Sequence, residues 1–240
     1  MQRLLGLVRK AVTEYEMISP GDRIAVGVSG GKDSVALAVV LGRLRSFLGV
    51  EFDIVAVTLD PCFEGVECDY SPVTELFEQE GIRHIVKRTD IGSIVFDVRG
   101  ETNPCSLCAR MRRGALHDLA KAEGCNKIAL GHHRDDAVET FLMSLLFEGR
   151  ISCFQPVTHM TRTGVDQIRP LLYAGEGRIA NLAKALELPI VENPCPEDRG
   201  SKRYEIKQLI RTMSQAYPDL RSKVFGAIQR APLDGWEKAR

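Results

Sequence analysis

The sequence predicts an α/β protein built on a doubly wound, mostly parallel sheet, with a helical C-terminal extension. Short apolar runs of strand composition alternate with segments whose apolar residues recur at helical spacing. Helices of this length between strands are typical of right-handed crossovers, which cover both faces of a parallel sheet. The chain has 240 residues, of which 44% are apolar, enough to bury one sizeable core.

The order of the predicted elements follows the chain. Strands are expected at 23–28, 52–60, 82–88 and 126–132, each followed by a helix. For the helix that begins near residue 71, Ser71 is a candidate N-cap and Pro72 occupies the first helical position. Beyond residue 147 the pattern changes: we expect a hairpin or extended excursion over 154–172, a helix and a short strand over 175–191, and basic helices from about 201.

Composition restricts the location of the protein more than its partners. Lys+Arg and Asp+Glu both number 32, and a neutral chain can still bind nucleic acid through clustered basic residues. The first 20 residues contain Glu14 and Glu16 and no small-residue cleavage site, so they predict an amphipathic helix rather than a signal peptide. No stretch approaches the roughly 18 apolar residues of a membrane span. We therefore expect a cytoplasmic protein that does not bind membranes.

A glycine turn between the first strand and its helix is the most informative string, VGVSGGKDS at 26–34. Gly30 and Gly31 permit close approach of a ligand to the backbone, and the helix N-terminus attracts phosphate. Lys32 adds a cation, and Ser29 and Ser34 add hydroxyl donors. The spacing fits neither a Walker A loop nor a dinucleotide fingerprint. The alternative is an ordinary tight turn.

The string SGGKDS resembles the PP-loop of the ATP pyrophosphatase superfamily, a Rossmann-like fold of adenine nucleotide alpha hydrolases. The resemblance implies that the loop binds the pyrophosphate end of ATP while an acceptor oxygen attacks the α-phosphate, with Mg²⁺ neutralising charge. Residues implied to bind ATP phosphates are Ser29, Gly30, Gly31, Lys32, Asp33 and Ser34.

Seven cysteines without an export signal favour metal binding or sulfur chemistry over disulfides. Cys105 and Cys108 form a C-x-x-C pair at the start of a helix, a position that favours the thiolate by lowering thiol pKa. The pair alone could be half a zinc site, a redox pair or chance. Cys195, flanked by Pro194 and Pro196, is a third candidate. Three thiolates can hold three irons of a [4Fe–4S] cluster, whereas structural zinc normally has four ligands.

The remaining cysteines carry weaker signals. Cys62 and Cys68 flank an acidic loop after the second strand; they could accept sulfur, but incidental or partly buried thiols are the favoured interpretation. Cys125 and Cys153 are interpreted as structural.

Polar residues also follow the other strand ends, where ligand sites of parallel sheets lie. In GHHRDD, Asp135 or Asp136 could cap the next helix, and a role around ATP and Mg²⁺ is favoured over a transition-metal site. Glu139, one turn further, could support it. Residues expected to line the nucleotide site are Asp60, Gly131, His132, Asp135 and Asp136.

Basic residues gather near two of the candidate cysteines. They could form solvated faces or contact an RNA backbone. Aromatic residues make up only 6% of the chain, which argues against a broad stacking platform but permits a pocket for one flipped base. The candidate nucleic-acid contacts are Arg110, Arg112, Arg113, Arg169, Lys202 and Arg203.

The whole pattern resembles the tRNA 2-thiocytidine synthetase family, a PP-loop branch, over nearly the full chain. SGGKDS, CSLCARMRRG, LGHHRDDAVET and IRPLLY occur in the family's order, and Cys195 matches the third cluster cysteine. The resemblance implies a cluster bound by Cys105, Cys108 and Cys195, with Lys32 and Asp33 completing the catalytic set. It implies three parts: an N-terminal helix (1–20), an ATP-binding domain (21–192), and a C-terminal cysteine loop with a basic helical extension (193–240).

The leading hypothesis is therefore an ATP-dependent tRNA sulfurtransferase that adenylates a base oxygen and replaces it with sulfur. By resemblance the base is a cytidine in the anticodon loop, and the partners are tRNA, a sulfur donor such as a cysteine desulfurase or free sulfide, and a second copy of the chain. The alternatives are a PP-loop ligase similar to tRNA lysidine synthetase, or a zinc-bearing nucleotide-binding protein without thiolation activity.

Overall fold

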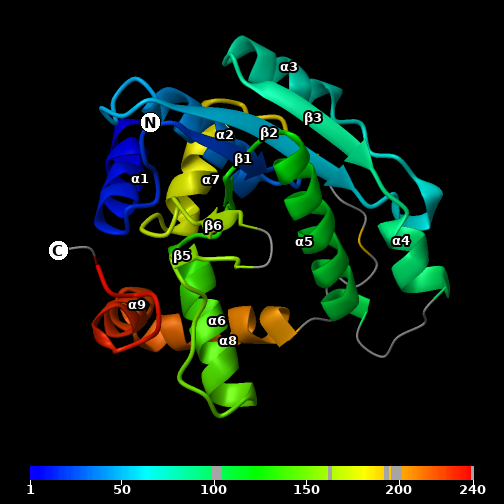
Figure 1. Cartoon of the computed structure of the whole chain (residues 1–240). Helices are drawn as coiled ribbons and strands as arrows, with labels where there is room; N and C mark the ends of the chain where they lie inside the picture. Colours follow the sequence, from blue (N-terminus) through cyan, green and yellow to red (C-terminus); the bar gives the residue numbers. More distant parts are fainter. Residues whose placement is uncertain (99–103, 162–163, 192–194, 196–201, 239–240) are drawn as a thin grey trace.

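The computed structural model describes residues 1–98, 104–161, 164–191, 195 and 202–238. Its centre is a six-stranded sheet of order β3-β2-β1-β4-β6-β5 (Figure 1). All neighbouring strands are parallel except β5 and β6, which pair antiparallel. The strands are β1 (Asp22–Gly27), β2 (Phe52–Asp60), β3 (Arg83–Arg88), β4 (Lys127–Ala129), β5 (Val157–Thr158) and β6 (Asp166–Ile168). The predicted parallel sheet and the hairpin beyond residue 147 are confirmed.

Helices cover both faces of this sheet. Helix α5 contacts β1, β2 and β4 on one face, while α2 packs with α1, α3 and α7 on the other. The helices are α1 (Gln2–Glu14), α2 (Lys32–Leu44), α3 (Ser71–Gln79), α4 (Ile91–Ser93), α5 (Pro104–Ala122), α6 (Arg134–Phe147), α7 (Glu176–Ala185), α8 (Lys202–Ala216) and α9 (Leu220–Arg230). Two short turns, η1 (Phe63–Gly65) and η2 (Ile94–Val98), flank α4. No described helix is long and apolar enough to span a membrane.

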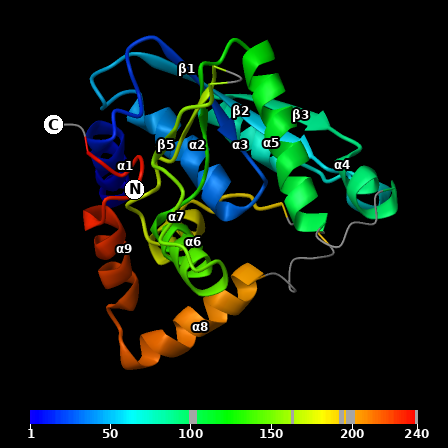
Figure 2. The ribbon, with the colours of Figure 1, turned by 60° about the horizontal axis from the view of Figure 1, so that its bottom comes forward.

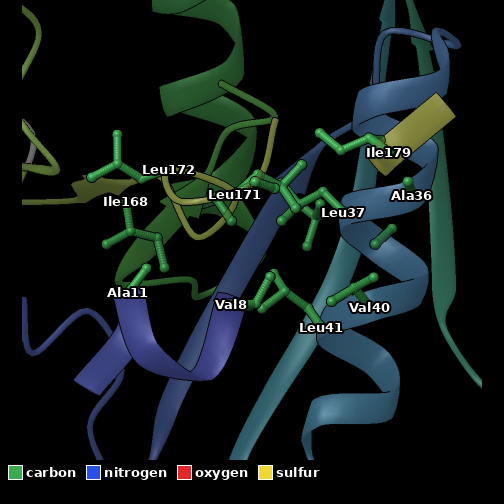
Figure 3. Close-up of a cluster of buried hydrophobic side chains, with 14 of the residues drawn as sticks. Val8, Ala11, Ala36, Leu37, Val40, Leu41, Ile168, Leu171, Leu172 and Ile179 are labelled. Atoms are coloured by element: carbon green, nitrogen blue, oxygen red, sulfur yellow. The ribbon is translucent and has the colours of Figure 1, made fainter. Parts of the chain in front are cut away.

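Helix α2 is the centre of the main core. It carries a continuous run of buried residues from Ser34 to Leu41, as expected for a helix enclosed on all sides. Figure 3 shows Leu37 and Leu41 of this helix beside Val8 of α1. Because α2 is enclosed in this way, the loop that precedes it is anchored to the most rigid part of the molecule.

The basic C-terminal extension is helical, as predicted, and consists of α8 and α9. Both helices contact α6, which leads away from the sheet, and Figure 2 shows the three helices below it. Pro194, Pro196 and most of the predicted cysteine loop lie outside the described residues.

Two local predictions differ from the structure. Tyr70, not Ser71, is the N-cap of α3, because the Asp69 carboxylate accepts a hydrogen bond from the Ser71 backbone N–H (2.9 Å) and Ser71 already has helical geometry. Residues 188–191 form no strand. Instead the Val191 N–H donates to the Gly30 carbonyl (3.0 Å), so this segment runs against the glycine turn.

Candidate active site

The glycine turn between β1 and α2 is fixed by hydrogen bonds made by its own serines. The Ser34 hydroxyl donates to the Gly31 carbonyl (2.9 Å) and accepts from the Ser29 backbone N–H (3.1 Å). The two serine hydroxyl oxygens lie 3.2 Å apart. Gly31 is the N-cap of α2, and no side chain caps the helix there. The first N–H groups of α2 are therefore left for a ligand, as an anion site requires.

Two glycines allow other segments to approach this turn. Gly30 has φ +87°, and an added Cβ would lie 2.9 Å from the Val191 carbonyl oxygen. A Cβ on Gly131, which follows β4, would lie 3.3 Å from the backbone of Asp33 and Ser34. The predicted neighbourhood of Gly131 and the glycine turn is thus present in the structure.

Lys32 is held at the mouth of the turn by two carboxylates. Its Nζ lies 2.9 Å from Glu176 Oε1 and 3.1 Å from Asp33 Oδ2. Burial alone would lower the pKa of Lys32, but Glu176 and Asp33 outweigh it, and the pKa is raised. The other carboxylate oxygen of Asp33 is buried and has no hydrogen-bond partner among the described residues. The turn thus presents one cation and one carboxylate oxygen that makes no hydrogen bond to the described residues and has His133 Nε2 at 3.9 Å.

The acidic residues that follow β4 serve as caps. The His133 N–H donates to Asp136 Oδ2 (2.9 Å), and His133 Nδ1 accepts from the Asp136 N–H (3.3 Å), which closes a capping box on α6. The N-cap of α6 is therefore His133 rather than either aspartate, and Asp136 takes part as the N3 residue of the capping box. Asp135 does not take part; its Oδ2 accepts from the Glu176 N–H (2.6 Å) at the start of α7. Sequence spacing could not show this, because α7 lies forty residues away.

Helix α8 supplies positive charge to the acidic face of α6. Arg203 lies 3.2 Å from Asp136 Oδ1 and 3.3 Å from Glu139 Oε2, and Lys207 lies 4.0 Å from Glu139 Oε1. Glu139 is buried, and burial raises its pKa despite these cations. These contacts hold α8 against α6: Nη1 of Arg203 is shared by the two carboxylates, and its Nη2 donates to Thr140 Oγ1 (3.3 Å).

A cavity of about 490 Å³ joins the glycine turn to the helix that carries the cysteine pair. Gly27, Val28 and Ser29 line one side, and Ala109, Arg112 and Arg113 of α5 line another. None of its described lining residues is Asp or Glu. It is lined by four arginines, namely Arg112, Arg113, Arg169 and Arg203, together with His132, Phe154, Gln167, Thr140, Val57, Leu59, Leu116 and Leu130.

Only some of the predicted site residues meet at this cavity. His132 and four of the six predicted RNA-contacting residues line it. Arg110 is exposed on α5, and Lys202 is engaged by Glu205 (2.9 Å) and lies over the Phe147 ring. Asp60 is buried at the end of β2 and is not among the lining residues.

The Asp60 carboxylate organises the turn that carries the second cysteine pair. Its two oxygens accept from the backbone N–H groups of Cys62 (3.1 Å) and Cys68 (2.9 Å). Burial raises the pKa of both thiols, and the charge of Asp60 adds to the effect. The role of Cys62 and Cys68 stays a prediction, since a raised pKa is also found at Cys108.

Two of the three candidate cluster cysteines, Cys108 and Cys195, share one apolar pocket, which we call the cysteine pocket. Cys108 is buried with Phe63, Ile91 and Leu107, and Cys195 packs against the same group. Cys105 precedes it by one helical turn on α5 and is exposed.

The electrostatics of Cys108 differ from the expectation. Burial raises its pKa, the nearby Cys195 and Cys105 thiols raise it further, and Arg112 opposes them. The predicted lowering by the helix N-terminus is wrong for Cys108, because desolvation by residues distant in sequence dominates.

Within the described part of the chain, no three His, Cys, Asp or Glu side chains already stand at metal-ligand spacing. Cys105 and Cys195 nevertheless lie close enough to Cys108 to raise its pKa, so three sulfur donors, the number that a [4Fe–4S] cluster with one open iron uses, lie in one region of the structure. Metal loading here therefore requires a local adjustment and the release of thiol protons.

Several residues of the site were not predicted. Glu176 holds Lys32, Phe154 lies beneath Arg169, and Gln167 joins Arg169 to His117. No periodic signal in the sequence predicted Gln167, which follows Asp166 in the mixed string VDQIR at 165–169.

Comparisons with known proteins identify the family. A family model of the PP-loop domain matches residues 5–213. The tRNA-cytidine(32) 2-sulfurtransferase of Syntrophotalea carbinolica is 37% identical over 95% of this chain and 88% of its own length. The enzyme of the same name from Pelobacter propionicus is 39% identical over 95% and 85%.

A solved structure, the U34-tRNA thiolase NcsA from Methanococcus maripaludis with its [4Fe–4S] cluster, superposes with a TM-score of 0.77 at 24% identity, covering 95% of this chain and 77% of that one. At this identity the superposition establishes the shared fold. The chain therefore belongs to the PP-loop proteins and, among them, to the tRNA-cytidine(32) 2-sulfurtransferase family.

Proposed function

We propose that this protein uses ATP to replace the 2-oxygen of cytidine 32 in tRNA with sulfur, the reaction named for its relatives. One observation carries the proposal: a single cavity, lined by four arginines and no described carboxylate, connects the glycine turn to the helix that bears Cys105 and Cys108. A polyanionic nucleotide and a nucleic acid are the ligands that such a cavity attracts.

The glycine turn binds the phosphates of ATP in this proposal. The free N–H groups of α2 and the Lys32 ammonium lie where pyrophosphate develops charge. Mg²⁺ fits the Asp33 oxygen that makes no hydrogen bond to the described residues, because carboxylate oxygen is its preferred protein ligand. Asp135 and Asp136 are less suited to Mg²⁺, since a backbone N–H and arginines already engage them.

Cys105, Cys108 and Cys195 would hold a [4Fe–4S] cluster, which supplies an open iron for sulfide when bound. The chain's own residues place the base and ATP beside these thiols: Ala109 and Arg112, next to Cys108 on α5, line the same cavity as Ser29. The base oxygen attacks the α-phosphate, pyrophosphate leaves, and sulfide then displaces AMP. This chemistry distinguishes the proposal from a lysidine synthetase–like ligase, which needs no cluster.

The finer partners belong to the proposal as well. We infer a cytoplasmic enzyme that receives sulfur from a cysteine desulfurase or free sulfide. The exposed apolar residues Leu146, Phe147 and Ile151 at the end of α6 are compatible with a second copy of the chain.

The test is thiolation in vitro. The anaerobically reconstituted protein, with ATP, Mg²⁺, sulfide and unmodified tRNA carrying C32, should form 2-thiocytidine and AMP in equal amounts, measured by nucleoside mass spectrometry and nucleotide chromatography. Formation of AMP with transfer of an amine, or formation of no thionucleoside by a fully loaded protein, would reject the proposal.

A further inference from the structure

The buried guanidinium of Arg169 has no carboxylate partner among the residues that the structure describes. It is 6% exposed, lines the cavity and lies 5.0 Å above the centre of the Phe154 ring. Burial lowers its pKa to about 10. A desolvated cation without a counter-charge is costly, and such groups are retained where a ligand completes them.

The hydrogen bonds of Arg169 leave one edge of the guanidinium uncommitted. Its Nη1 donates to the Gln155 carbonyl (2.6 Å) and to Thr158 Oγ1 (2.9 Å), which uses both of its hydrogens. Its Nη2 makes one long contact with Gln167 Oε1 (3.5 Å). Nε is enclosed and has no partner in the described chain. Nε–H and the second Nη2–H form the side-on fork that arginine uses for bidentate recognition.

Gln167 fixes the orientation of this fork. Its amide nitrogen lies 2.7 Å from Nε2 of the buried His117, so the amide donates and the neutral imidazole accepts. Burial, with the charge of Arg113 nearby, lowers the pKa of His117. The amide oxygen of Gln167 is thereby turned toward Arg169, and Gln167 acts as a positioning residue.

A second enclosed group in the same cavity is unpaired. His132 Nδ1 is buried without a hydrogen-bond partner, and its ring lies 5.3 Å from the Phe154 ring. Burial, with Arg169 nearby, lowers the pKa of His132 to about 4, so the neutral ring can accept a hydrogen bond at physiological pH.

These donors and acceptors match one base edge. Cytosine offers adjacent acceptors at O2 and N3 and a donor at N4, whereas uracil carries a hydrogen at N3 and an acceptor at O4. We propose that the side-on edge of Arg169 binds O2 and N3 of the target cytosine, with His132 accepting from N4, so that Arg169 determines cytosine over uracil. This inference rests on the proposed function and deepens it.

Binding of the base requires a small local shift, because Arg169 Nε and His132 Nδ1 are closed to solvent before the base enters. The free energy for the shift comes from satisfying two buried groups that otherwise have no partner. A site of this kind rejects the wrong base strongly, because uracil would place its N3 hydrogen against the arginine fork.

The experiment compares thiolation of two anticodon stem-loops that differ only in C or U at position 32, with ATP saturating. Arg169→Lys keeps the charge and removes the fork, and should lower kcat/KM for the cytidine substrate by about 10- to 100-fold, the worth of one bidentate pair. The KM for ATP should stay unchanged. Binding of the two RNAs, measured by anisotropy with a non-hydrolysable ATP analogue present, should lose its preference for cytidine.

Two further variants separate recognition from folding and from simple charge. Arg113 lies on the exposed side of the cavity. Arg113→Lys should weaken the binding of both RNAs equally and leave the preference for cytidine over uridine intact. Gln167→Leu should reduce the preference less than Arg169→Lys does. Thermal melting of each variant confirms folding.

The outcomes are distinct. Arg169→Lys with an undiminished preference for cytidine overturns the inference, as does a raised KM for ATP with the preference intact, which would assign Arg169 to a phosphate. Wild-type protein that thiolates neither RNA overturns the proposed function instead.

Discussion

The glycine turn and the cysteine pocket differ in how completely they are built: Ser29 of the turn lines the cavity, whereas the cysteine pocket adjoins it only through the neighbouring residues Ala109 and Arg112 of α5. At the turn, Ser29, Ser34, Lys32 and Glu176 already hold one another in place. At the cysteine pocket, Cys108 is buried, Cys105 is exposed, and Cys195 approaches from a distant segment. Under the proposed function, the turn is a phosphate site whose side chains already hold one another, and the cysteines are a metal site that the cofactor completes.

The largest effect should follow from Cys108→Ala. It removes a thiol that only the cysteine pocket uses, so thiolation should fall by at least about 1000-fold, the scale of losing an essential group. The Kd for ATP should change less than about threefold, because the turn is built independently. Cys125→Ala, another buried thiol, is the control and should retain activity. Equal losses of ATP binding and thiolation would mean that the glycine turn and the cysteine pocket do not act independently.

Lys32→Ala should impair the glycine turn and leave the cysteine pocket intact. Removing a cation that stabilises developing charge on phosphate typically costs about 100- to 1000-fold in rate, so AMP formation should drop by that factor in a stopped-time assay. The iron content should match that of the wild type. Glu176→Gln is the matched variant: it loosens Lys32 and should give a smaller loss. Undiminished AMP formation by Lys32→Ala would count against phosphate binding by the turn.

Gly30→Ala tests how tightly the turn is packed. Its positive φ costs about 1 kcal/mol for alanine, and the contact with the Val191 carbonyl should add about 1–3 kcal/mol. Gly49 also has a positive φ, +81°, but has open space around it. Gly49→Ala should therefore lose only the roughly 1 kcal/mol that the backbone conformation costs. Urea unfolding of the two variants measures the difference. Equal destabilisation would show that the 188–191 segment does not press on the turn.

The smallest effect concerns a contact outside both regions. Asp22 lies 2.7 Å from Lys127; burial would raise the pKa of Asp22, but Lys127, the Ser19 N–H and Asn126 lower it overall. A lowered pKa stabilises the fold above the unfolded value of about 4 and is lost as pH falls through the folded value. Asp22→Asn should therefore lower the free energy of unfolding at pH 7 by about 1–3 kcal/mol, and this difference should shrink as pH falls from about 4 through the folded pKa of Asp22. Asp53 is exposed, so Asp53→Asn should leave the free energy of unfolding unchanged over the same pH range.

Much of the fold followed from the sequence because the buried strands are continuous apolar runs. The strand predicted at 52–60 was found unchanged, and the family resemblance is confirmed by the comparisons. Local signals sufficed for the glycine turn as well, since its ligand-binding groups are adjacent in sequence.

The predictions that differed depend on contacts between distant segments. Asp135 reaches α7, Val191 reaches Gly30, and the apolar residues around Cys108 come from η1 and α4. Gln167 acquires its role only when β6 is placed beside α5. Contacts between distant segments produce no periodic pattern in the sequence, so a single sequence does not predict them.

The central claim is that Cys105, Cys108 and Cys195 bind one iron–sulfur centre beside the nucleotide cavity. Its most direct measurement is the iron and acid-labile sulfide content of anaerobically reconstituted wild type and of each single serine variant. We predict about four iron and four sulfide per wild-type chain, and less than about half of that in each variant. Full loading of Cys195→Ser would contradict the account.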